Sequence, residues 1–156
     1  MPDPYDSLKM KNQLCFPLYA ASREIVRMYT PYLAPLDLTY TQYIAMMVIW
    51  EQKSVLVKEL GRILHLDSGT LTPVLKKLEA RGYITRRRLP GDERNVVIEP
   101  TEDGMTLRER AKSVPAQVGK CVGLLPDEAV TLYALLYQLL GSLESEVIQE
   151  RLVDMA

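Results

Sequence analysis

The chain has 156 residues, of which 47% are hydrophobic and 25% are charged, as in ordinary globular proteins. These values exclude a disordered tail, a collagen-like repeat and a bare solenoid, and no stretch reaches the roughly 18 unbroken apolar residues of a spanning helix. The first residues are polar and lack the apolar region of a signal peptide. We therefore expect a cytoplasmic protein without a membrane segment, whose two cysteines are thiols at rest.

The net charge of −1 hides an uneven distribution of charged residues. Residues 53–94 contain ten basic and five acidic side chains, a net charge of +5, and the rest of the chain carries −6. A basic middle between acidic flanks is typical of a module that contacts a polyanion such as DNA. A solvated charged face has the same composition, so charge alone leaves both interpretations open.

Residues 7–29 predict a first helix, because apolar residues recur there at spacings of three, four or seven. Pro17 removes a backbone donor and restricts Phe16, so the helix is expected to kink just after Cys15 or to begin there. Thr30-Pro31 is expected to end or bend it. A second helix is expected over residues 40–50, with Thr39 as its N-cap.

Residues 55–83 predict two short helices joined by a tight turn, which is the helix-turn-helix pattern. The second of them, residues 68–80, would be capped by Asp67 or Ser68 and closed by Gly82. Residues 84–88 and 95–99 predict the two strands of a hairpin, with a Pro-Gly turn between them. A helix-turn-helix followed directly by a basic hairpin is a winged helix.

A further helix is expected from Thr101 to about Val122, bent or interrupted by Pro115, and Pro126 would open the last helix. The last helix is apolar over more than one stripe, which favours a helical subunit interface over a plain intramolecular bundle. The predicted fold is mainly α with a small β wing. Its predicted parts are N-terminal dimerisation helices (1–50), a winged helix-turn-helix (51–100) and C-terminal dimerisation helices (101–156).

Small hydroxyl residues occupy the first turn of the predicted recognition helix, where free backbone N–H groups and the positive end of the helix dipole also lie. Such a turn can donate hydrogen bonds to phosphates and to base edges in the major groove. In the wing, Asp92 could hold Arg94 extended toward a minor groove, although a solvated pair of turn residues has the same sequence. The predicted DNA-binding residues are Ser68, Thr70, Thr72, Lys76, Lys77, Arg86, Arg88 and Arg94.

Cys15 lies on the apolar face of the first predicted helix, where a small buried hydrophobe and a reactive thiol are both open interpretations. Tyr19 lies one turn away, and Tyr29 and Tyr40 flank the junction to the next helix. A phenol that donates a hydrogen bond to sulfur favours the thiolate, which is the nucleophilic form. The same tyrosines could serve only in core or interface packing.

Several segments resemble the organic hydroperoxide-sensing repressors of the MarR family. They are Asn12-Gln13-Leu14-Cys15-Phe16, Leu18-Tyr19, Ser22-Arg23-Glu24, Leu38-Thr39-Tyr40-x-Gln42-Tyr43, Leu66-Asp67-Ser68-Gly69-Thr70-Leu71-Thr72-Pro73 and Asp92-Glu93-Arg94. The resemblance covers about Asn12 to Gly104 and, more loosely, the last helix. It implies a homodimeric winged-helix repressor that binds a pseudo-palindromic DNA operator. In that family the peroxide-reactive cysteine matches Cys15, and the tyrosines that bond it across the dimer match Tyr29 and Tyr40, with Tyr19 nearby.

Some members of the family have a second, late cysteine that traps the oxidised one across the dimer, and Cys121 occupies a comparable region. The resemblance thus implies that an organic hydroperoxide oxidises Cys15 to a sulfenic acid, that Cys121 of the other subunit forms a disulfide with it, and that DNA is released. The other interpretation of Cys121 is an incidental thiol, because its neighbours form no strong motif. Pro17 departs from the usual pattern of the family.

Three further interpretations stay open. A ligand-responsive MarR repressor would bind a phenolic compound at the dimer interface with Cys15 inert, a thiol peroxidase would turn over peroxide, and a helix bundle would only bind other proteins. The sequence does not supply the helix-N-terminal cysteine with an adjacent arginine that a peroxidase usually has, and the basic wing over residues 86–94 argues against a simple bundle. No metal or cofactor is expected, because His65 is the single histidine and no CxxC or HxxxH spacing occurs.

Overall fold

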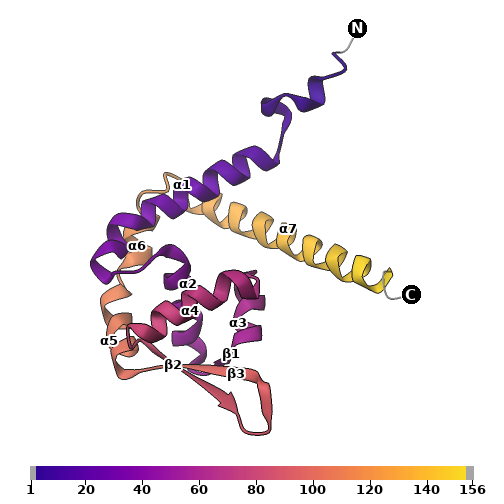
Figure 1. The fold of residues 1–156 in the computed structure, drawn as a ribbon. Helices are drawn as coiled ribbons and strands as arrows, with labels where there is room; N and C mark the ends of the chain where they lie inside the picture. The colour runs from indigo at the N-terminus through magenta and orange to yellow at the C-terminus, as the bar shows by residue number, and fades with distance from the viewer. Residues whose placement is uncertain (1–2, 154–156) are drawn as a thin grey trace. The chain divides into compact units, whose positions relative to one another are not determined.

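The computed structural model describes residues 3–153, without the side chains of 92–94 and 145–153, and Figure 1 shows its ribbon. The chain forms two compact units, one that ends at Cys121 and one that begins at Val122. The fold is mainly helical with one small three-stranded antiparallel sheet, so the predicted fold class is confirmed. Among the described residues, no helix is both long and apolar enough to cross a membrane.

The first long helix, α1, runs from Cys15 to Leu33. The sequence predicts a helix over residues 7–29 that either kinks just after Cys15 or begins there. The structure has the second alternative, a helix that begins at Cys15. Pro17 fits because it lies in the first turn, where a backbone N–H has no acceptor within the helix. Of the two outcomes expected at Thr30-Pro31, the structure does not have the end of the helix, because α1 continues through this proline to Leu33. The bend stays a prediction. Three 3-10 turns flank α1: η1 (Asp6–Leu8), η2 (Met10–Asn12) and η3 (Ala34–Leu36).

Helix α2 (Tyr40–Gln52) is the central core helix of the first unit. Thr39 caps it as predicted: the Thr39 side chain accepts from the Gln42 N–H at 3.3 Å, and the Gln42 side chain accepts from the Thr39 N–H at 2.9 Å. Trp50 Nε1 donates to the Gly104 carbonyl at 2.8 Å, which ties α2 to the chain beyond the sheet. The buried residues of α2 are Gln42, Tyr43, Ala45, Met46, Val48, Ile49 and Trp50.

Helices α3 (Val57–Leu64) and α4 (Ser68–Ala80) form the helix-turn-helix that the sequence predicts. The turn between them begins at His65, which has a positive φ of 52°. The chain passes very close to α3 there, since a Cβ added at Gly61 would lie 2.9 Å from the Leu66 carbonyl oxygen. The residues of α4 that are buried in the core are Leu71, Leu75 and Leu78.

The sheet has the strand order β1-β3-β2, and all its pairs are antiparallel. Its strands are β1 (Val55–Leu56), β2 (Ile84–Leu89) and β3 (Asp92–Pro100). Strands β2 and β3 form the predicted wing, and their turn uses Gly91 at a φ of 83°. The sequence does not predict β1, because two residues are too few to show an alternating pattern. Its partners on β3 are Ile98 and Val97.

Helices α5 (Glu102–Ala111) and α6 (Val114–Gly119) follow the sheet. The Thr101 hydroxyl caps α5 by accepting from the Gly104 N–H at 3.0 Å. The sequence predicts one helix to about Val122 with a bend or interruption at Pro115. The interruption is confirmed, and Pro115 lies in the first turn of α6.

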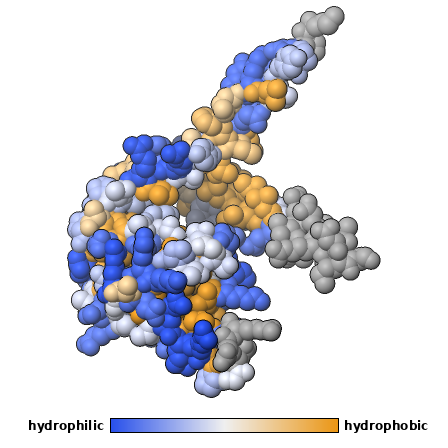
Figure 2. All heavy atoms as spheres, viewed as in Figure 1, coloured by the Kyte–Doolittle hydropathy of each residue, from blue (hydrophilic) through white to orange (hydrophobic). Residues whose placement is uncertain are grey.

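The second unit is dominated by helix α7 (Pro126–Val153), which Pro126 opens as predicted. Its exposed large apolar residues are Val130, Leu132, Tyr133, Leu135, Tyr137, Leu139, Leu140 and Leu143. Figure 2 shows apolar side chains gathered on the coloured, N-terminal part of this helix. An apolar surface of this extent is typical of a protein–protein interface, and the predicted dimerisation remains a prediction.

Candidate functional site

The outward face of α4 carries most of the residues predicted to contact DNA. Exposed on it are Ser68, Thr70, Thr72, Lys76 and Lys77. The buried leucines lie on the opposite side of the same helix. A solvent-exposed helix face with hydroxyl and ammonium groups, directly after a tight turn, can contact phosphates and base edges in a major groove.

Asp67, rather than Ser68, caps α4. Its carboxylate accepts from the Thr70 backbone N–H and from the Thr70 hydroxyl, both at 2.9 Å. These two hydrogen bonds, the backbone one first, lower the pKa of Asp67. Because the hydroxyl proton of Thr70 is engaged in the cap, Thr70 can contact a base in this geometry only as an acceptor.

The wing places its arginines in different surroundings. Arg88 is exposed, as a DNA-contacting residue must be. Arg86 is half-buried, and its Nε lies 3.7 Å from the Glu79 carboxylate, which is too far for a hydrogen bond. The side chains of Asp92 and Arg94 lie outside the described residues, so their pairing stays a prediction from the sequence.

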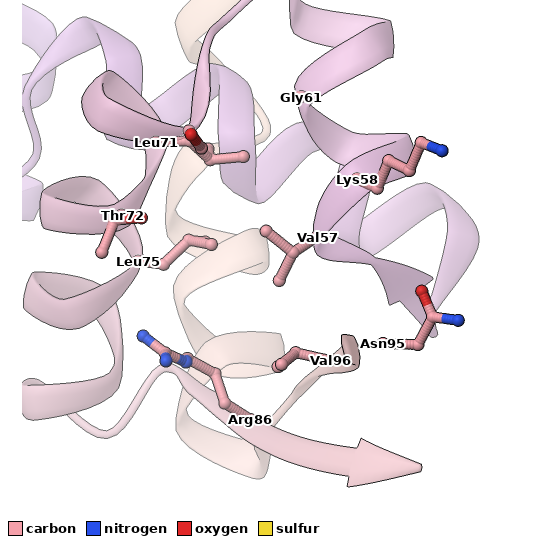
Figure 3. Close-up of a pocket in the computed structure, with 10 residues that line it drawn as sticks. Val57, Lys58, Gly61, Leu71, Thr72, Leu75, Arg86, Asn95 and Val96 are labelled. Atoms are coloured by element: carbon pink, nitrogen blue, oxygen red, sulfur yellow. The ribbon is translucent and has the colours of Figure 1, made fainter. Parts of the chain in front are cut away.

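A cavity of about 420 Å³ lies between α3, α4 and the wing. Figure 3 shows Arg86 reaching from β2 toward α4, while Lys58 and Asn95 point away. The Arg86 Nε is buried and has no hydrogen-bond acceptor among the described residues. The apolar side chains of the cavity wall are Val57, Leu71, Leu75 and Val96. A cationic donor without an acceptor beside an apolar wall can bind a small organic anion.

Cys15 is the first residue of α1, and its side chain is exposed. Within one chain, Cys15 is therefore not a small buried hydrophobic residue. Free N–H groups and the positive end of the helix dipole lie at this position and favour a negative charge there. A helix that begins at Cys15 is one of the two alternatives that the sequence gives. The arginine of the peroxidase pattern is not next to this cysteine in the sequence, because the first arginine of the chain is Arg23.

Tyr19 lies one helical turn beyond Cys15 and is paired with Arg23. The Tyr19 hydroxyl accepts from Arg23 Nη1 at 2.9 Å, and the guanidinium carbon lies 5.5 Å from the centre of the ring. A guanidinium can only donate hydrogen bonds, so the proton of the Tyr19 hydroxyl is left to donate elsewhere. Tyr19 is thus oriented by Arg23 and remains a candidate donor to sulfur.

Tyr29, Tyr40 and Tyr43 form a cluster at the junction of α1 and α2. The ring centroids of Tyr29 and Tyr40 are 4.9 Å apart, and those of Tyr29 and Tyr43 are 5.9 Å apart. Burial raises the pKa of Tyr40 and of Tyr43, and the neighbouring phenols add to the increase. These two phenols therefore stay protonated at neutral pH, as hydrogen-bond donors must. A cavity of about 280 Å³ adjoins the cluster and is lined by Val26, Thr30, Leu33, Ala34, Leu38, Thr39 and Tyr40.

The reactive-thiol candidate and the tyrosine cluster lie at opposite ends of α1. Tyr29 follows Cys15 by 14 residues, which is about 21 Å along a helix axis. Tyr40 contacts Tyr29, so within one chain neither phenol reaches Cys15. A hydrogen bond between them requires two chains.

Cys121 lies near the same far end of α1. Its sulfur is 3.6 Å from the Tyr32 hydroxyl, and Tyr32 follows Cys15 by 17 residues, about 25 Å along the helix. A disulfide needs Cα atoms about 4.4–6.8 Å apart. A single chain with α1 intact therefore cannot join Cys15 to Cys121, and a disulfide between them has to connect two chains.

Comparisons with known proteins agree with this architecture. The structure of reduced AbfR bound to DNA matches with a TM-score of 0.73 and 33% identity over 90% of this chain and 99% of AbfR. A mutant of E. coli MarR in complex with operator DNA matches with a TM-score of 0.76 and 26% identity over 88% and 99%. The family model of the transcriptional regulators SarA/Rot matches residues 27–110. The organic hydroperoxide resistance transcriptional regulator of Bacillus subtilis (strain 168) is 44% identical over 94% of this chain and 99% of its own length. The chain belongs to the MarR family.

As a MarR-family member, the protein is a DNA-binding transcriptional regulator and not an enzyme. The resemblance to the organic hydroperoxide regulators is confirmed by the Bacillus relative. The roles of the individual site residues, and membership of the two-cysteine group, stay predictions.

Sequence reasoning about this MarR regulator missed two features of the thiol sites. It did not include Tyr32, whose contact with Cys121 joins residues 89 positions apart and leaves no local signal. It also left Tyr43 out of the tyrosine cluster, although Tyr43 lies one helical turn from Tyr40 and could have been included on spacing alone.

Proposed function

We propose that the protein is a homodimeric repressor that binds a pseudo-palindromic operator when reduced and releases it when an organic hydroperoxide oxidises Cys15. One observation carries this proposal: an exposed thiol at one end of α1 and a cluster of protonated phenols at the other. Within one chain, the Cys15 thiol and the phenols of Tyr29 and Tyr40 are too far apart to contact each other. Two chains that place the Cys15 end of one beside the Tyr29–Tyr40 end of the other would complete two identical sites.

The exposed apolar surface of the chain supports the dimer. Besides the apolar side chains of α7, the start of the chain exposes Leu8, Met10, Leu14, Phe16 and Leu18. Burial of apolar area stabilises association by roughly 25 cal/mol per Å², and symmetric pairing of one chain with a second copy covers the same surface on both. In such a dimer, two α4 helices would enter successive major grooves about 34 Å apart, with the wings in flanking minor grooves.

The oxidation uses the chemistry of the thiolate. The Cys15 sulfur attacks the terminal oxygen of the hydroperoxide, the O–O bond breaks, and the alcohol leaves with one proton, so that the thiol becomes a sulfenic acid. The phenols of Tyr29 and Tyr40 of the other chain would donate hydrogen bonds to the sulfur before the reaction. The apolar cavity beside Tyr40 would hold the organic group of the peroxide, which favours organic hydroperoxides over hydrogen peroxide.

Disulfide formation would couple oxidation to DNA release. Cys121 of the other subunit condenses with the sulfenic acid, with loss of water. Because a disulfide has a narrow geometric window, helices that start with the two sulfurs farther apart have to move. Such a movement would change the spacing of the two recognition helices and weaken operator binding.

A second candidate function is release of DNA by a small aromatic acid. The buried Nε of Arg86 beside the apolar cavity of the winged unit supports it, because this group has no hydrogen-bond acceptor in the described part of the chain and its ion pair with Glu79 is long, at 3.7 Å. This site would differ from the dimer-interface site expected from the sequence. In this case Cys15 would be inert, and release would occur in excess reductant.

One experiment separates the two candidates. Wild-type protein and the Cys15→Ser variant are bound to a DNA site selected in vitro from a random-sequence pool. Cumene hydroperoxide is expected to release the wild type but not the variant, and mass spectrometry of the thiols should show Cys15 oxidised. Release of the variant by the hydroperoxide would refute the redox proposal, and release of both proteins by salicylate in excess reductant would support the ligand-responsive one.

A further inference from the structure

We infer that Tyr32 is the positioning residue of Cys121: its hydroxyl holds the thiol sulfur against α1 and sets the rate at which this sulfur attacks an electrophilic sulfur. The inference rests on the proposed function for the identity of that electrophile, the sulfenic acid of Cys15 in the other chain. The contact between Tyr32 and Cys121 itself belongs to the single chain.

Three hydrogen bonds fix Cys121 just after the end of α6. Its backbone N–H donates to the Val118 carbonyl at 2.8 Å and closes a turn. Its thiol donates to the Gln117 carbonyl at 3.5 Å, and its sulfur lies 3.6 Å from the Tyr32 hydroxyl. The backbone bond holds the Cα, and the two side-chain bonds select one orientation of the sulfur.

The number of available protons decides which group donates in the hydrogen bond between Tyr32 and Cys121. A thiol has one proton, and here it is donated to the Gln117 carbonyl, so the sulfur is left to accept from Tyr32. Cys121 raises the pKa of Tyr32, first through the hydrogen bond and then through its charge. The Tyr32 phenol therefore keeps its proton and donates a hydrogen bond to the Cys121 sulfur.

Of the two side-chain bonds of Cys121, only the tyrosine bond survives when the thiol ionises. A thiolate has no proton for the Gln117 carbonyl, whereas the Tyr32 hydroxyl can still donate to it, and a bond to a charged sulfur is the stronger one. Tyr32 lies on α1, against which α6 packs, so the donor is held by a long helix rather than by a loop. The thiolate of Cys121, which is the nucleophilic form, thus keeps one side-chain hydrogen-bond donor, the Tyr32 hydroxyl.

The contact between Tyr32 and Cys121 would serve formation of the disulfide from the sulfenic acid, a reaction that needs no further reactant. The Cys121 sulfur attacks the sulfur of the Cys15 sulfenic acid, an S–S bond forms and the S–O bond breaks. The hydroxide that leaves takes the proton of the Cys121 thiol and departs as water. Tyr32 gives a hydrogen bond throughout and transfers no proton.

The first test uses the full chain with Cys15→Ser, in which Cys121 is the single remaining thiol. Its reaction with 5,5′-dithiobis(2-nitrobenzoic acid) forms a mixed disulfide and releases a coloured thiolate. Adding Tyr32→Phe keeps the ring and removes the hydroxyl, and the rate is expected to fall about fivefold, the value of one hydrogen bond. The matched control Tyr83→Phe should leave the rate within about twofold of the parent, since Tyr83 lies on the turn between α4 and β2.

The second test uses chains that keep Cys15 and receive one equivalent of cumene hydroperoxide, with dimedone to trap the sulfenic acid. Tyr32→Phe should oxidise Cys15 at the wild-type rate, form the disulfide about fivefold more slowly and give more dimedone adduct. In a Cys121→Ser background, Tyr32→Phe should not change the lifetime of the sulfenic acid.

The outcomes separate the inference from the proposed function. Unchanged rates for Tyr32→Phe in both tests would overturn the positioning role of Tyr32, even if the wild type forms the disulfide. Absence of the disulfide in the wild type would refute resolution by Cys121, while the first test would still decide whether Tyr32 controls the reactivity of this thiol. An effect of Tyr32→Phe on sulfenic acid lifetime in the Cys121→Ser background would show that Tyr32 acts elsewhere and would also overturn the inference.

Discussion

The substitution Gly104→Ala tests how the wing is joined to the core. Gly104 lies in the first turn of α5, and a Cβ at this position would overlap the Tyr83 carbonyl oxygen well inside 3.0 Å. That carbonyl accepts from the Thr101 N–H at 3.1 Å at the base of the wing, and the Gly104 carbonyl accepts from Trp50 at 2.8 Å. The new methyl group must therefore push apart backbone that two hydrogen bonds hold together.

The expected cost follows from these contacts. Moving the backbone to make room costs about 2 kcal/mol, and weakening the two hydrogen bonds costs about 1 kcal/mol each. The better helix propensity of alanine offsets about 1 kcal/mol of this. The free energy of unfolding should therefore fall by about 3 kcal/mol, and the melting temperature by about 9 °C for a chain of this size.

Urea denaturation at one fixed protein concentration measures this change. The matched control is Gly119→Ala on α6, where an added Cβ meets nothing within 4 Å and φ is not in the left-handed region, so stability should be unchanged or slightly higher. The reasoning is refuted if Gly104→Ala unfolds at the same urea concentration as Gly119→Ala. Because the overlap lies at the base of the wing, the affinity of Gly104→Ala for DNA should fall as well.

The remaining predictions concern the two functional surfaces. Because burial raises the pKa of Tyr40, the neutral phenol stabilises the fold fully below its ordinary value of about 10, and this contribution is lost as the pH rises through the raised value. The free energy of unfolding should therefore fall less steeply above about pH 10 in Tyr40→Phe than in the wild type; equal slopes would contradict this. Arg94→Ala should weaken DNA binding and reduce the salt slope by about one, whereas Arg108→Ala on α5 should change neither, and an unchanged slope for Arg94→Ala would remove it from the DNA surface. Cys121→Ser should stop at the sulfenic acid or a mixed disulfide, and a covalent dimer on a non-reducing gel would exclude Cys121 as the resolving thiol.

Local signals predict most of the fold. The capping residues Thr39 and Asp67, the glycine at position 91 and the prolines at 115 and 126 act through the backbone of their own neighbours, so their effects can be inferred from a few adjacent residues. The sequence allows two alternatives for the start of α1, because a 3-10 turn and a helical turn place apolar residues at similar spacings.

Features that depend on distant parts of the chain could not be predicted in the same way. Strand β1 exists because two residues meet β3 about 40 positions later, and the burial of Arg86 depends on the approach of α4 to the wing. The contact of Tyr32 with Cys121 depends on the packing of α6 against α1. The exposed polar side of α4 is predictable from the sequence because the helix has a single leucine stripe, which places the polar residues on the other side.

The central claim is that the thiol site is shared between two chains, and a mixed dimer tests it most directly. One chain carries Cys15→Ser, and the other carries Tyr29→Phe with Tyr40→Phe. In this dimer the single Cys15 would face the intact tyrosines of the Cys15→Ser chain, so it should react with cumene hydroperoxide at the wild-type rate, whereas the Tyr29→Phe, Tyr40→Phe homodimer reacts slowly. A mixed dimer that reacts no faster than this homodimer would contradict the account.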